Sequence, residues 1–447
     1  MRRGAMPGRK RPGARARFCL RSLLIDAGTA CEGRRWFCLS LHYFSCMAHV
    51  TLSSPIRILH LVPEILPTHR VDVLALFGKY LPRHDVTCDV IGRSDDKPLT
   101  AQQGFASVRR VAQTGGRLRR ELRFALTCLR AALGASPDRY DAVQVRDLVS
   151  TGLLVMLAAR LRGIPFLFWM SFPMCEGRIV RARNSGWRGR IVLAKGLLEK
   201  WLLYRVVLPG ARHVFVQSDA MGDMVAAQGI ARDKITAVPM GVDTELIVQP
   251  EGTGSRREGV PQIAYLGTLD KLRRLDLVID ALRLVRERHP SAELLLIGGG
   301  EPSDAAALHE HAARLGLQDA VRITGWMPAP QAWGMLRAAD AAISYIPRGI
   351  VFDVSSPTKI LEYLALGMPS VANDIPDQVW VLRNSDAGWL TGSTVAELAA
   401  ALCEILDDPE ASRARAARGP AFIEATRSYR VLAEQLAGRY RQLVGKR

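Results

Sequence analysis

The sequence predicts an α/β protein made of two doubly wound parallel-sheet domains that face each other across a cleft. The chain has 447 residues, and single hydrophobic cores stop growing near about 250 to 300 residues, so at least two domains are expected. Short β-rich runs alternate with helical patterns in both halves of the chain, an order typical of parallel sheets. A stretch rich in glycine, proline and charge, Val248 to Val260, separates the halves and is the predicted linker.

In the first half, the strand patterns begin at Ile56 with IRILHLVPE and continue with VTCDVIG, YDAVQV, IPFLFWM, RHVFVQS and KITAVPMGV. Helical patterns such as VDVLALFGKYL and LVSTGLLVMLAARLRG lie between them. After the linker the strands are QIAYLG, AELLLIGGG, VRITGWM, AAISYIP and PSVAND, and two helical stretches follow from Val395. We expect domains at 49–248 and 249–420, and a C-terminal helix at 421–447 that packs back on the first domain.

Composition and charge exclude several classes of protein. With 48% hydrophobic and 23% charged residues, the chain is not collagen-like, wholly disordered or a disulfide scaffold. A net charge of +18 indicates an anionic partner, namely nucleic acid, a membrane face or phosphates. The sequence has no run of 18 uninterrupted apolar residues, so no membrane-spanning helix is expected.

The first 46 residues differ from the rest in charge. They contain ten basic and two acidic residues, which is +8 of the total. Such an Arg-rich, acid-poor segment is similar to a transit peptide; the alternatives are a true start at Met47 and a disordered arm. Its four cysteines lack the spacing of a metal site and are expected to be free thiols: Cys19, Cys31, Cys38 and Cys46. We expect residues 1–48 to be an extension outside the two domains.

The segment Asp353 to Asp374 predicts a short helix with a functional start. Ser356 is a favourable N-cap, Pro357 suits the first helical position, and Gly367 ends the helix. Lys359 and Glu362 are three residues apart and share a face. A helix start beside a lysine can bind phosphate, and a carboxylate one turn later can accept hydrogen bonds from sugar hydroxyls. The alternative is an exposed ion pair that stabilises the helix by about 0.2 to 0.5 kcal/mol.

Two other segments point to phosphate binding. Arg273 and Arg274 lie at the start of a helix expected near Leu275, and arginine binds phosphate oxygens with a planar fork of donors. The alternative is a solvated basic turn. The run Gly298 to Gly300 follows a strand and permits close approach of a nucleotide, or it is a plain tight turn.

Together these motifs resemble glycosyltransferase family 4, the retaining nucleotide-sugar transferases of the GT-B fold with two Rossmann-like domains. The resemblance covers residues 56 to 430 and rests on VFVQSDAMGDMVAAQGIARDKITAVPMGVD, YLGTLDKLRRLDLVIDAL, LLLIGGGE, ITGWMP and SSPTKILEYLALGMPSVAND. It implies a UDP-, GDP- or TDP-sugar donor held by the C-terminal domain, with no metal or cofactor.

The resemblance also implies roles for particular residues. Glu362 matches the second carboxylate of the E-x7-E motif, which binds the ribose, and Arg273 or Arg274 stands at the diphosphate-binding lysine. The implied catalytic set is Arg273, Arg274, Lys359 and Asp353. The implied donor-binding set is Glu362, Gly267, Thr268, Gly298, Gly299, Gly300, Gly325, Ser356, Pro357 and Thr358.

The sequence departs from the family pattern at several positions. Val354 replaces the first glutamate of E-x7-E, and Asp353 is the adjacent substitute. Thr268 stands where the family has an arginine. The glycine pair after the first strand is missing, and Ser171 or Phe172 is nearest to an expected histidine. Candidates on the acceptor side are His69, Arg70 and Ser171.

The implied activity is transfer of a sugar, with retention of configuration, to a hydroxyl of a glycan or lipid-linked acceptor in bacterial surface polysaccharide synthesis. The alternatives are a non-catalytic nucleotide-sugar or lipid-binding protein, another GT-B enzyme such as a sugar-nucleotide epimerase, and, from charge alone, a nucleic-acid-binding protein. Nucleic acid is not the expected partner, because no recognised binding module is present.

Basic and apolar residues are interleaved in RRVAQTGGRLRRELRFALTCLR and around Trp187 and Trp201. This composition is typical of interfacial helices on anionic lipid. We therefore expect a cytoplasmic enzyme at the inner face of the membrane. The alternative is a solvated charged helix face.

Overall fold

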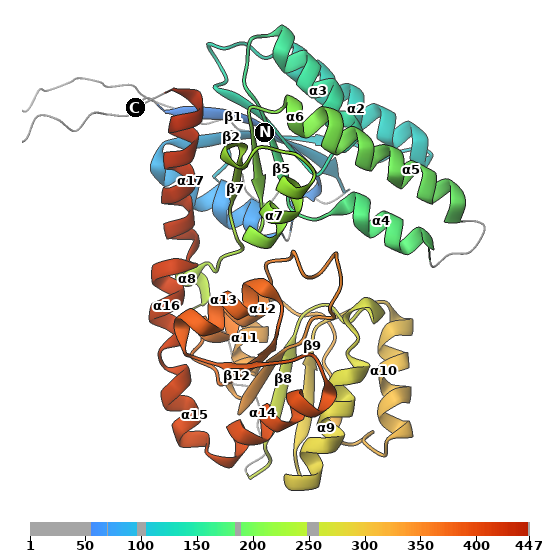
Figure 1. The fold of residues 1–447 in the computed structure, drawn as a ribbon, viewed down its shortest axis with the longest axis vertical. Coiled ribbons are helices and arrows are strands. Elements are labelled where there is room, and N and C mark those ends of the chain that lie inside the picture. The colour runs from blue at the N-terminus through green and yellow to red at the C-terminus, as the bar shows by residue number, and fades with distance from the viewer. Residues whose placement is uncertain (1–54, 69, 96–103, 184–188, 248–258, 446–447) are drawn as a thin grey trace, which may run out of the picture. The chain divides into compact units, whose positions relative to one another are not determined.

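Two parallel β-sheets, one of seven strands and one of six, form the framework of the protein (Figure 1). The computed structural model describes residues 55–68, 70–95, 104–183, 189–247 and 259–445, all within one compact unit, Ser53–Arg447. The predicted extension at 1–48 and positions 248–258 of the predicted linker lie outside the described residues. The predicted fold class, two doubly wound parallel-sheet domains, is confirmed. The domain limits stay predictions.

The first sheet, that of the N-terminal domain, has the strand order β3-β2-β1-β4-β5-β6-β7. Its strands are β1 (Ile56–Leu66), β2 (Val86–Ser94), β3 (Ser107–Val111), β4 (Ala142–Arg146), β5 (Phe166–Met170), β6 (His213–Val216) and β7 (Ile235–Ala237). The helical segments are η1 (Asp72–Tyr80), η2 (Leu81–His84), α2 (Arg117–Leu133), α3 (Val149–Leu161), α4 (Met174–Arg183), α5 (Gly189–Leu202), η4 (Leu203–Val207), α6 (Leu208–Gly210), α7 (Asp219–Ala227), η5 (Arg232–Lys234) and α8 (Thr244–Ile247). The order reverses between β1 and β4, so their carboxyl ends form the topological switch point, where such sheets bind ligands.

Alternate residues of the first sheet face two different cores, as the two-residue period of a strand requires. In β5, Phe166 and Phe168 pack with residues of α2 and α3, whereas Leu167 and Trp169 pack with residues of η1 and α17 (Tyr429–Val444). Because both faces are covered, β5 is fully buried. This burial explains why its sequence is a continuous apolar run rather than an alternating one.

The second sheet, that of the C-terminal domain, has the strand order β10-β9-β8-β11-β12-β13. Its strands are β8 (Gln262–Leu266), β9 (Glu293–Ile297), β10 (Val321–Ile323), β11 (Ala341–Ser344), β12 (Ser370–Asn373) and β13 (Trp389–Thr391). The helical segments are η6 (Lys271–Arg273), α9 (Asp276–Arg288), α10 (Pro302–Arg314), α11 (Ala329–Arg337), α12 (Thr358–Ala365), α13 (Pro376–Ser385), α14 (Val395–Asp407), α15 (Pro409–Ala416) and α16 (Gly419–Thr426). The switch point lies between β8 and β11.

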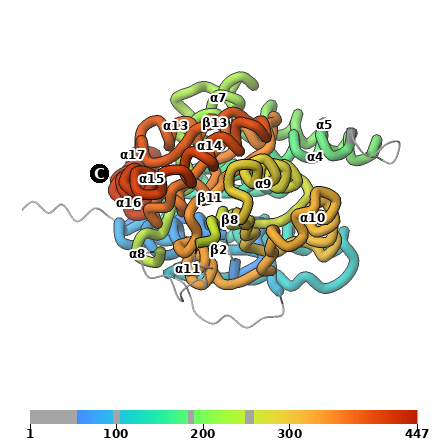
Figure 2. The backbone as a smooth tube through the Cα atoms, turned by 90° about the horizontal axis from the view of Figure 1, so that it is seen from below, coloured from blue at the N-terminus to red at the C-terminus, as the bar shows by residue number. Residues whose placement is uncertain are grey.

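Helices cover both faces of the second sheet. Leu294 and Leu296 of β9 pack with residues of α9, α10 and α14, and Leu295 and Ile297 pack with residues of α11, α12 and α16. In both views α9 and α10 lie on the opposite side of β8 from α15 and α16 (Figures 1 and 2). The loops at the carboxyl ends of β8, β9 and β11 are therefore held between two packed layers.

The C-terminal part of the chain differs from its prediction. The sequence predicted two helical stretches after Val395, and the structure has four helices, α14 to α17. The last of them packs on the first sheet, where the Tyr440 hydroxyl donates to Oε1 of Gln144 at 2.7 Å. Capping residues Asp408 and Ser428 accept from backbone N–H groups and begin α15 and α17.

Within the described ranges, every helix is too short or too polar to span a bilayer. The described cysteines are free thiols: Cys88, Cys128, Cys175 and Cys403. The four cysteines of the N-terminal extension lie outside the described residues.

Candidate functional site

Glycines form a close backbone crossing at the switch point of the second sheet. Gly267 follows β8 and Gly298 follows β9, with φ of 149° and 142°. A Cβ atom on Gly298 would lie 1.9 Å from the carbonyl oxygen of Gly267, and one on Gly267 would lie 2.6 Å from Cε of Lys359. Neither position can therefore accept a side chain without movement. The crossing leaves the Lys359 side chain against the backbone that follows β8.

The loops after β9 and β10 complete this crossing. The N–H of Leu269 donates to the carbonyl of Gly299 at 3.0 Å. A Cβ on Gly300 would lie 3.1 Å from the carbonyl oxygen of Leu269, and Gly298 forms a bridge with Gly325. The Thr268 carbonyl accepts from the Tyr265 hydroxyl at 3.3 Å. The structure thus brings together the glycines that the sequence assigned to donor binding.

Lys359 and Glu362 lie in the first two turns of α12, and burial shifts the pKa of both. Burial lowers the pKa of Lys359 to about 7, and nearby Arg273 lowers it further while Glu362 raises it. Burial raises the pKa of Glu362 to about 7, against the opposing effects of Lys359 and Trp333. Nζ of Lys359 lies 5.2 Å from the ring centre of Tyr265. Because burial and Arg273 both disfavour the ammonium charge of Lys359, an anionic ligand would be stabilised there.

A buried tyrosine ties α12 to the strands beneath it. The hydroxyl of Tyr363 accepts from the N–H of Leu266 at 2.9 Å and donates to the carbonyl of Ile343 at 3.4 Å. Leu266 ends β8 and Ile343 lies in β11, so one side chain joins α12 to both strands of the switch point. This bond fixes the position of Lys359 relative to Gly267.

The two predicted arginines have different surroundings. Arg273 ends η6, and its guanidinium carbon lies 5.5 Å from the ring centre of Phe352. In the described part of the chain, Arg273 forms no ion pair with a carboxylate, unlike Arg274. Arg274 has a positive φ of 51°, and its Nε and Nη2 donate to Asp276 at 2.9 to 3.1 Å. The helix begins at Asp276, so both arginines precede it rather than lie at its start.

Asp353, the predicted substitute for the first glutamate, is engaged within its own loop. Arg348 donates to its carboxylate at 2.8 Å, and the N–H of Gly349 donates to it at 3.1 Å. Arg348 also pairs with Asp374. Val354, at the motif position itself, is buried in the apolar cluster of the N-terminal domain, and its carbonyl accepts from Ser218 at 2.6 Å.

The prediction that Ser356 caps the helix is wrong. Pro357 is the N-cap residue, and α12 begins at Thr358 without a side-chain capping bond. The Ser356 hydroxyl instead accepts from the N–H of Met240 at 2.9 Å and donates to Asp377 at 2.7 Å. Long-range partners thus displace the local capping bond. The predicted end of the helix is confirmed, because Gly367 has a φ of 65° and the Met368 N–H donates back to Tyr363.

A second group of charges lies at the switch point of the first sheet. Arg146 ends β4 with a fully buried side chain; Nη2 lies 2.7 Å from Oδ2 of Asp72, and Nε lies 2.9 Å from Oε1 of Glu64 and 3.7 Å from Oδ2 of Asp147. Arg70 pairs with Asp72 at 3.4 Å. We call these five residues, together with Ser171, the Arg146 cluster. Lys359, Glu362, Arg273, Gly267 and Gly298 are the Lys359 cluster.

Burial acts to raise the pKa of all three carboxylates of the Arg146 cluster, but the net pKa shifts differ. Burial raises the pKa of Glu64 and of Asp147, with only partial compensation by Arg146. For Asp72, burial also acts to raise the pKa, but Arg146 and Arg70 together hold it below its usual value. Asp147 has a φ of 53°, accepts from the Ser171 N–H at 2.8 Å and accepts from the Ser171 hydroxyl. A non-glycine residue in this conformation is common at functional sites.

The structure places two of the three acceptor-side candidates in one cluster. Arg70 and Ser171 are joined through Asp72, Arg146 and Asp147. His69 lies outside the described residues. Arg146 and Asp147 were not among the residues predicted from the sequence, although one signal was present: a charged pair at the carboxyl end of a buried strand of a parallel sheet lies where ligands bind.

No group of three or more His, Cys, Asp or Glu residues in the described ranges is arranged to hold a metal ion. The expectation that neither a metal nor a cofactor is required stays a prediction.

Comparison with known proteins connects this geometry to a family. A model described as Glycosyltransferase Family 4 matches residues 72–246, and one described as Glycosyl transferases group 1 matches residues 260–408. Glycogen synthase from Mycobacterium tuberculosis is 30% identical over 246 residues, which are 53% of this chain and 55% of that protein. The chain therefore matches about half the length of this curated relative.

Solved structures show the same fold at low identity. Sucrose-phosphate synthase from Thermosynechococcus elongatus has a TM-score of 0.64 and 17% identity, covering 87% of this chain and 99% of that one. Anabaena Alr3699/HepE in complex with UDP and glucose has a TM-score of 0.63 and 16% identity, covering 87% and 100%. Both halves of the chain thus match models of glycosyltransferases, Glycosyltransferase Family 4 in the first half and Glycosyl transferases group 1 in the second, with the two-sheet fold that the sequence predicted. The chain belongs to glycosyltransferase family 4.

Proposed function

We propose that the protein transfers a sugar from a nucleotide-sugar donor to a hydroxyl of a glycan or lipid-linked acceptor, with retention of anomeric configuration. The observation that carries the proposal is the Lys359 cluster, in which a lysine and an arginine lie at a sheet switch point against backbone that only glycine can form. Such a site suits the diphosphate of the donor. The Anabaena relative, whose structure contains UDP and glucose, has the same fold.

In the proposed reaction the bond between the anomeric carbon and the leaving phosphate oxygen breaks, and a bond from the acceptor oxygen forms on the same face. The acceptor proton passes to the departing diphosphate, so the protein supplies no strong base. Arg273 and Lys359 stabilise the charge that develops on the leaving group. Glu362 accepts hydrogen bonds from the ribose, and the Arg146 cluster orients the acceptor hydroxyl.

A thermal-shift and calorimetric screen of UDP-, GDP- and TDP-sugars tests donor binding. We expect one donor to stabilise the wild-type protein and to lose most of its affinity with Lys359→Met. Lys195→Met, which removes an exposed lysine of α5, is the matched control and should bind like wild type. If no nucleotide sugar binds wild type, or if both variants behave alike, the assignment of the donor site fails.

The retention of anomeric configuration and the class of acceptor are tested by a turnover assay. With a lipid-linked acceptor and the donor identified in the screen, NMR of the product should show the anomeric configuration of the donor. An inverted product would overturn the mechanism. We place this reaction in bacterial surface polysaccharide synthesis at the cytoplasmic face of the membrane, because an acceptor held in a bilayer requires its enzyme there.

One observation favours a second candidate, a binding protein without transferase activity. Val354 puts no carboxylate at the first position of E-x7-E, and neighbouring Asp353 is already paired with Arg348. The two candidates separate in a turnover assay with Asp353→Asn and Glu362→Gln. Activity in wild type that falls in either variant supports the transferase, and donor binding without any turnover supports the binding protein.

A further inference from the structure

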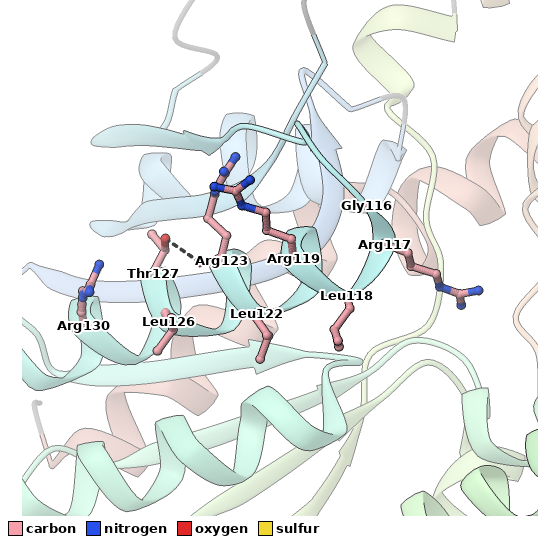
Figure 3. Close-up of a pocket in the computed structure, with 9 residues that line it drawn as sticks. All are labelled: Gly116, Arg117, Leu118, Arg119, Leu122, Arg123, Leu126, Thr127 and Arg130. Carbon is pink, nitrogen blue, oxygen red and sulfur yellow. Dashed lines mark hydrogen bonds between the residues drawn. The ribbon is translucent and has the colours of Figure 1, made fainter.

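Three neighbouring helices of the N-terminal domain expose apolar side chains to solvent. Helix α2 packs against α3, and α3 packs against α5. On α2 the exposed fractions are 74% for Leu118, 55% for Leu122 and 47% for Leu126. The three leucines are four residues apart, so they form one stripe along the helix. Figure 3 shows them projecting from one side of α2, while Arg119 and Arg123 project from another side.

Helices α3 and α5 continue this pattern. Large apolar side chains that are at least 40% exposed are Leu154, Leu157 and Leu161 of α3 and Ile191, Val192, Leu197, Leu198 and Trp201 of α5. Isolated exposed leucines are normal on a protein surface, but stripes on three adjacent helices are not. We call these side chains, with the three leucines of α2, the α2–α3–α5 surface.

The charges on α2 indicate what covers this surface. The helix contains five arginines, Arg117, Arg119, Arg120, Arg123 and Arg130, and one acidic residue, Glu121, which pairs with Arg93. In the described part of the chain, none of the five arginines forms an ion pair with a carboxylate. Apolar stripes beside unneutralised arginines match the interface of an anionic bilayer, where leucines enter the acyl region and arginines remain at the headgroups.

We propose that the α2–α3–α5 surface binds the face of an anionic lipid bilayer. Trp201, 58% exposed on α5, then lies at the headgroup boundary, where an indole with one polar edge is favoured. The bilayer would hold the lipid-linked acceptor, and in that respect the proposal rests on the proposed function. Vesicle binding, however, needs neither donor nor acceptor, so the two proposals can fail separately.

Flotation of the full chain with vesicles of phosphatidylcholine, with or without phosphatidylglycerol, tests the proposal. Wild type should float with the anionic vesicles at low salt and largely dissociate at high salt, because screening weakens the arginine contacts. The double variant Arg117→Gln/Arg119→Gln should lose roughly tenfold or more in partitioning to anionic vesicles. Absence of wild-type binding at low salt, or equal binding to neutral vesicles, overturns the proposal.

A matched pair of leucine variants separates this surface from general hydrophobicity. Leu126 of α2 and Leu246 of α8 are each 47% exposed. Leu126→Ser should lower partitioning by about tenfold, and Leu246→Ser should leave it unchanged. Both variants replace exposed residues, and circular dichroism checks that each is folded. Equal partitioning of the two variants contradicts the proposal.

Quenching by brominated lipid supplies a readout that is independent of affinity. Wild type should show tryptophan quenching on anionic brominated vesicles, and Trp201→Phe should lose most of it. Unchanged quenching in Trp201→Phe contradicts the proposal. The rival occupant is a second copy of the chain: if light scattering shows a dimer that Leu126→Ser dissociates while vesicle binding is unchanged, the surface is a dimer interface and the membrane proposal is wrong.

Discussion

The two sheet switch points of this protein hold opposite balances of charge. In the Arg146 cluster three carboxylates surround the buried side chain of Arg146, and Arg70 forms a further ion pair with Asp72. In the Lys359 cluster two cations share one carboxylate, Glu362, and burial leaves Lys359 with a pKa near 7. The first cluster thus has three carboxylates against two arginines, whereas the second has two cations against one carboxylate. The difference suggests that the second site binds an anion and that the first binds neutral hydroxyl groups.

The largest expected effect comes from a substitution in the Arg146 cluster. Arg146→Met removes the cation that three buried carboxylates share, and removing one partner of a buried ion pair destabilises proteins by about 3 to 5 kcal/mol. Urea unfolding at pH 7.5 measures the change in the free energy of unfolding. Lys359→Met removes a charge of the Lys359 cluster that burial and Arg273 already disfavour, so it should lower that free energy by less than about 1 kcal/mol.

If the two methionine variants are equally stable, the contrast in charge balance is wrong. Should Arg146→Met fail to fold, Arg146→Lys supplies the comparison. It keeps the charge but loses the planar fork, so its loss of stability should be smaller.

The second prediction concerns the leaving group. Arg273→Ala should lower kcat by about 10²- to 10³-fold, as removal of a donor to developing negative charge does in other enzymes. Arg274 is already paired with Asp276. The variant Arg274→Ala should therefore lower kcat much less than Arg273→Ala does. Steady-state kinetics with the identified donor measure both. Equal losses of kcat in the two variants would show that Arg274 stabilises the leaving group despite its pairing with Asp276.

The residues of the Lys359 cluster could be selected from the sequence because their signals are local, and their roles stay predictions. Glycines at strand ends, a lysine and a glutamate three residues apart, and an arginine pair after a strand can each be recognised within a few residues. Their meeting at one point follows from the parallel sheet, in which the carboxyl ends of neighbouring strands share an edge. The helix that carries Lys359 was also predicted, to within two residues at its start.

The Arg146 cluster could not be predicted in the same way. Its members come from β1, the start of η1, the end of β4 and the residue after β5. Glu64 and Arg146 are 82 positions apart, so the local sequence does not indicate that they meet. Ser356 is the opposite case, in which a local signal is present but misleading. Its position favours a capping role, but its hydroxyl forms hydrogen bonds with Met240 and Asp377 instead. Local rules fail where tertiary hydrogen bonds are more favourable.

The third prediction tests whether the Arg146 cluster contacts the acceptor. Ser171→Ala removes the hydroxyl that donates to Asp147, and loss of one hydrogen bond should raise the acceptor KM by roughly five- to tenfold. The dissociation constant of the donor should not change, because the donor binds at the other switch point. Parallel calorimetry of the donor and kinetics with varied acceptor measure the two quantities. A change confined to donor affinity would contradict the division of roles.

The smallest expected effect is a dependence of donor affinity on pH. In the unliganded protein the pKa of Lys359 is lowered to about 7, by burial first and by Arg273 second, while Glu362 and Asp270 oppose the shift. The diphosphate favours the protonated lysine, so above pH 7 binding must take up a proton. The dissociation constant should therefore rise by roughly fivefold between pH 7 and pH 8.

Calorimetry in buffers of different ionisation enthalpy measures this proton uptake directly. Below pH 7 the lysine is already protonated, so the affinity should level off, unless ionisation of the donor phosphates intervenes. Lys359→Met should bind more weakly and lose the dependence between pH 7 and pH 8, whereas Lys195→Met should keep it. A pH dependence that persists in Lys359→Met would assign it to the donor or to Glu362, and the Lys359 cluster would then hold its lysine charged at neutral pH, as the Arg146 cluster holds its arginine.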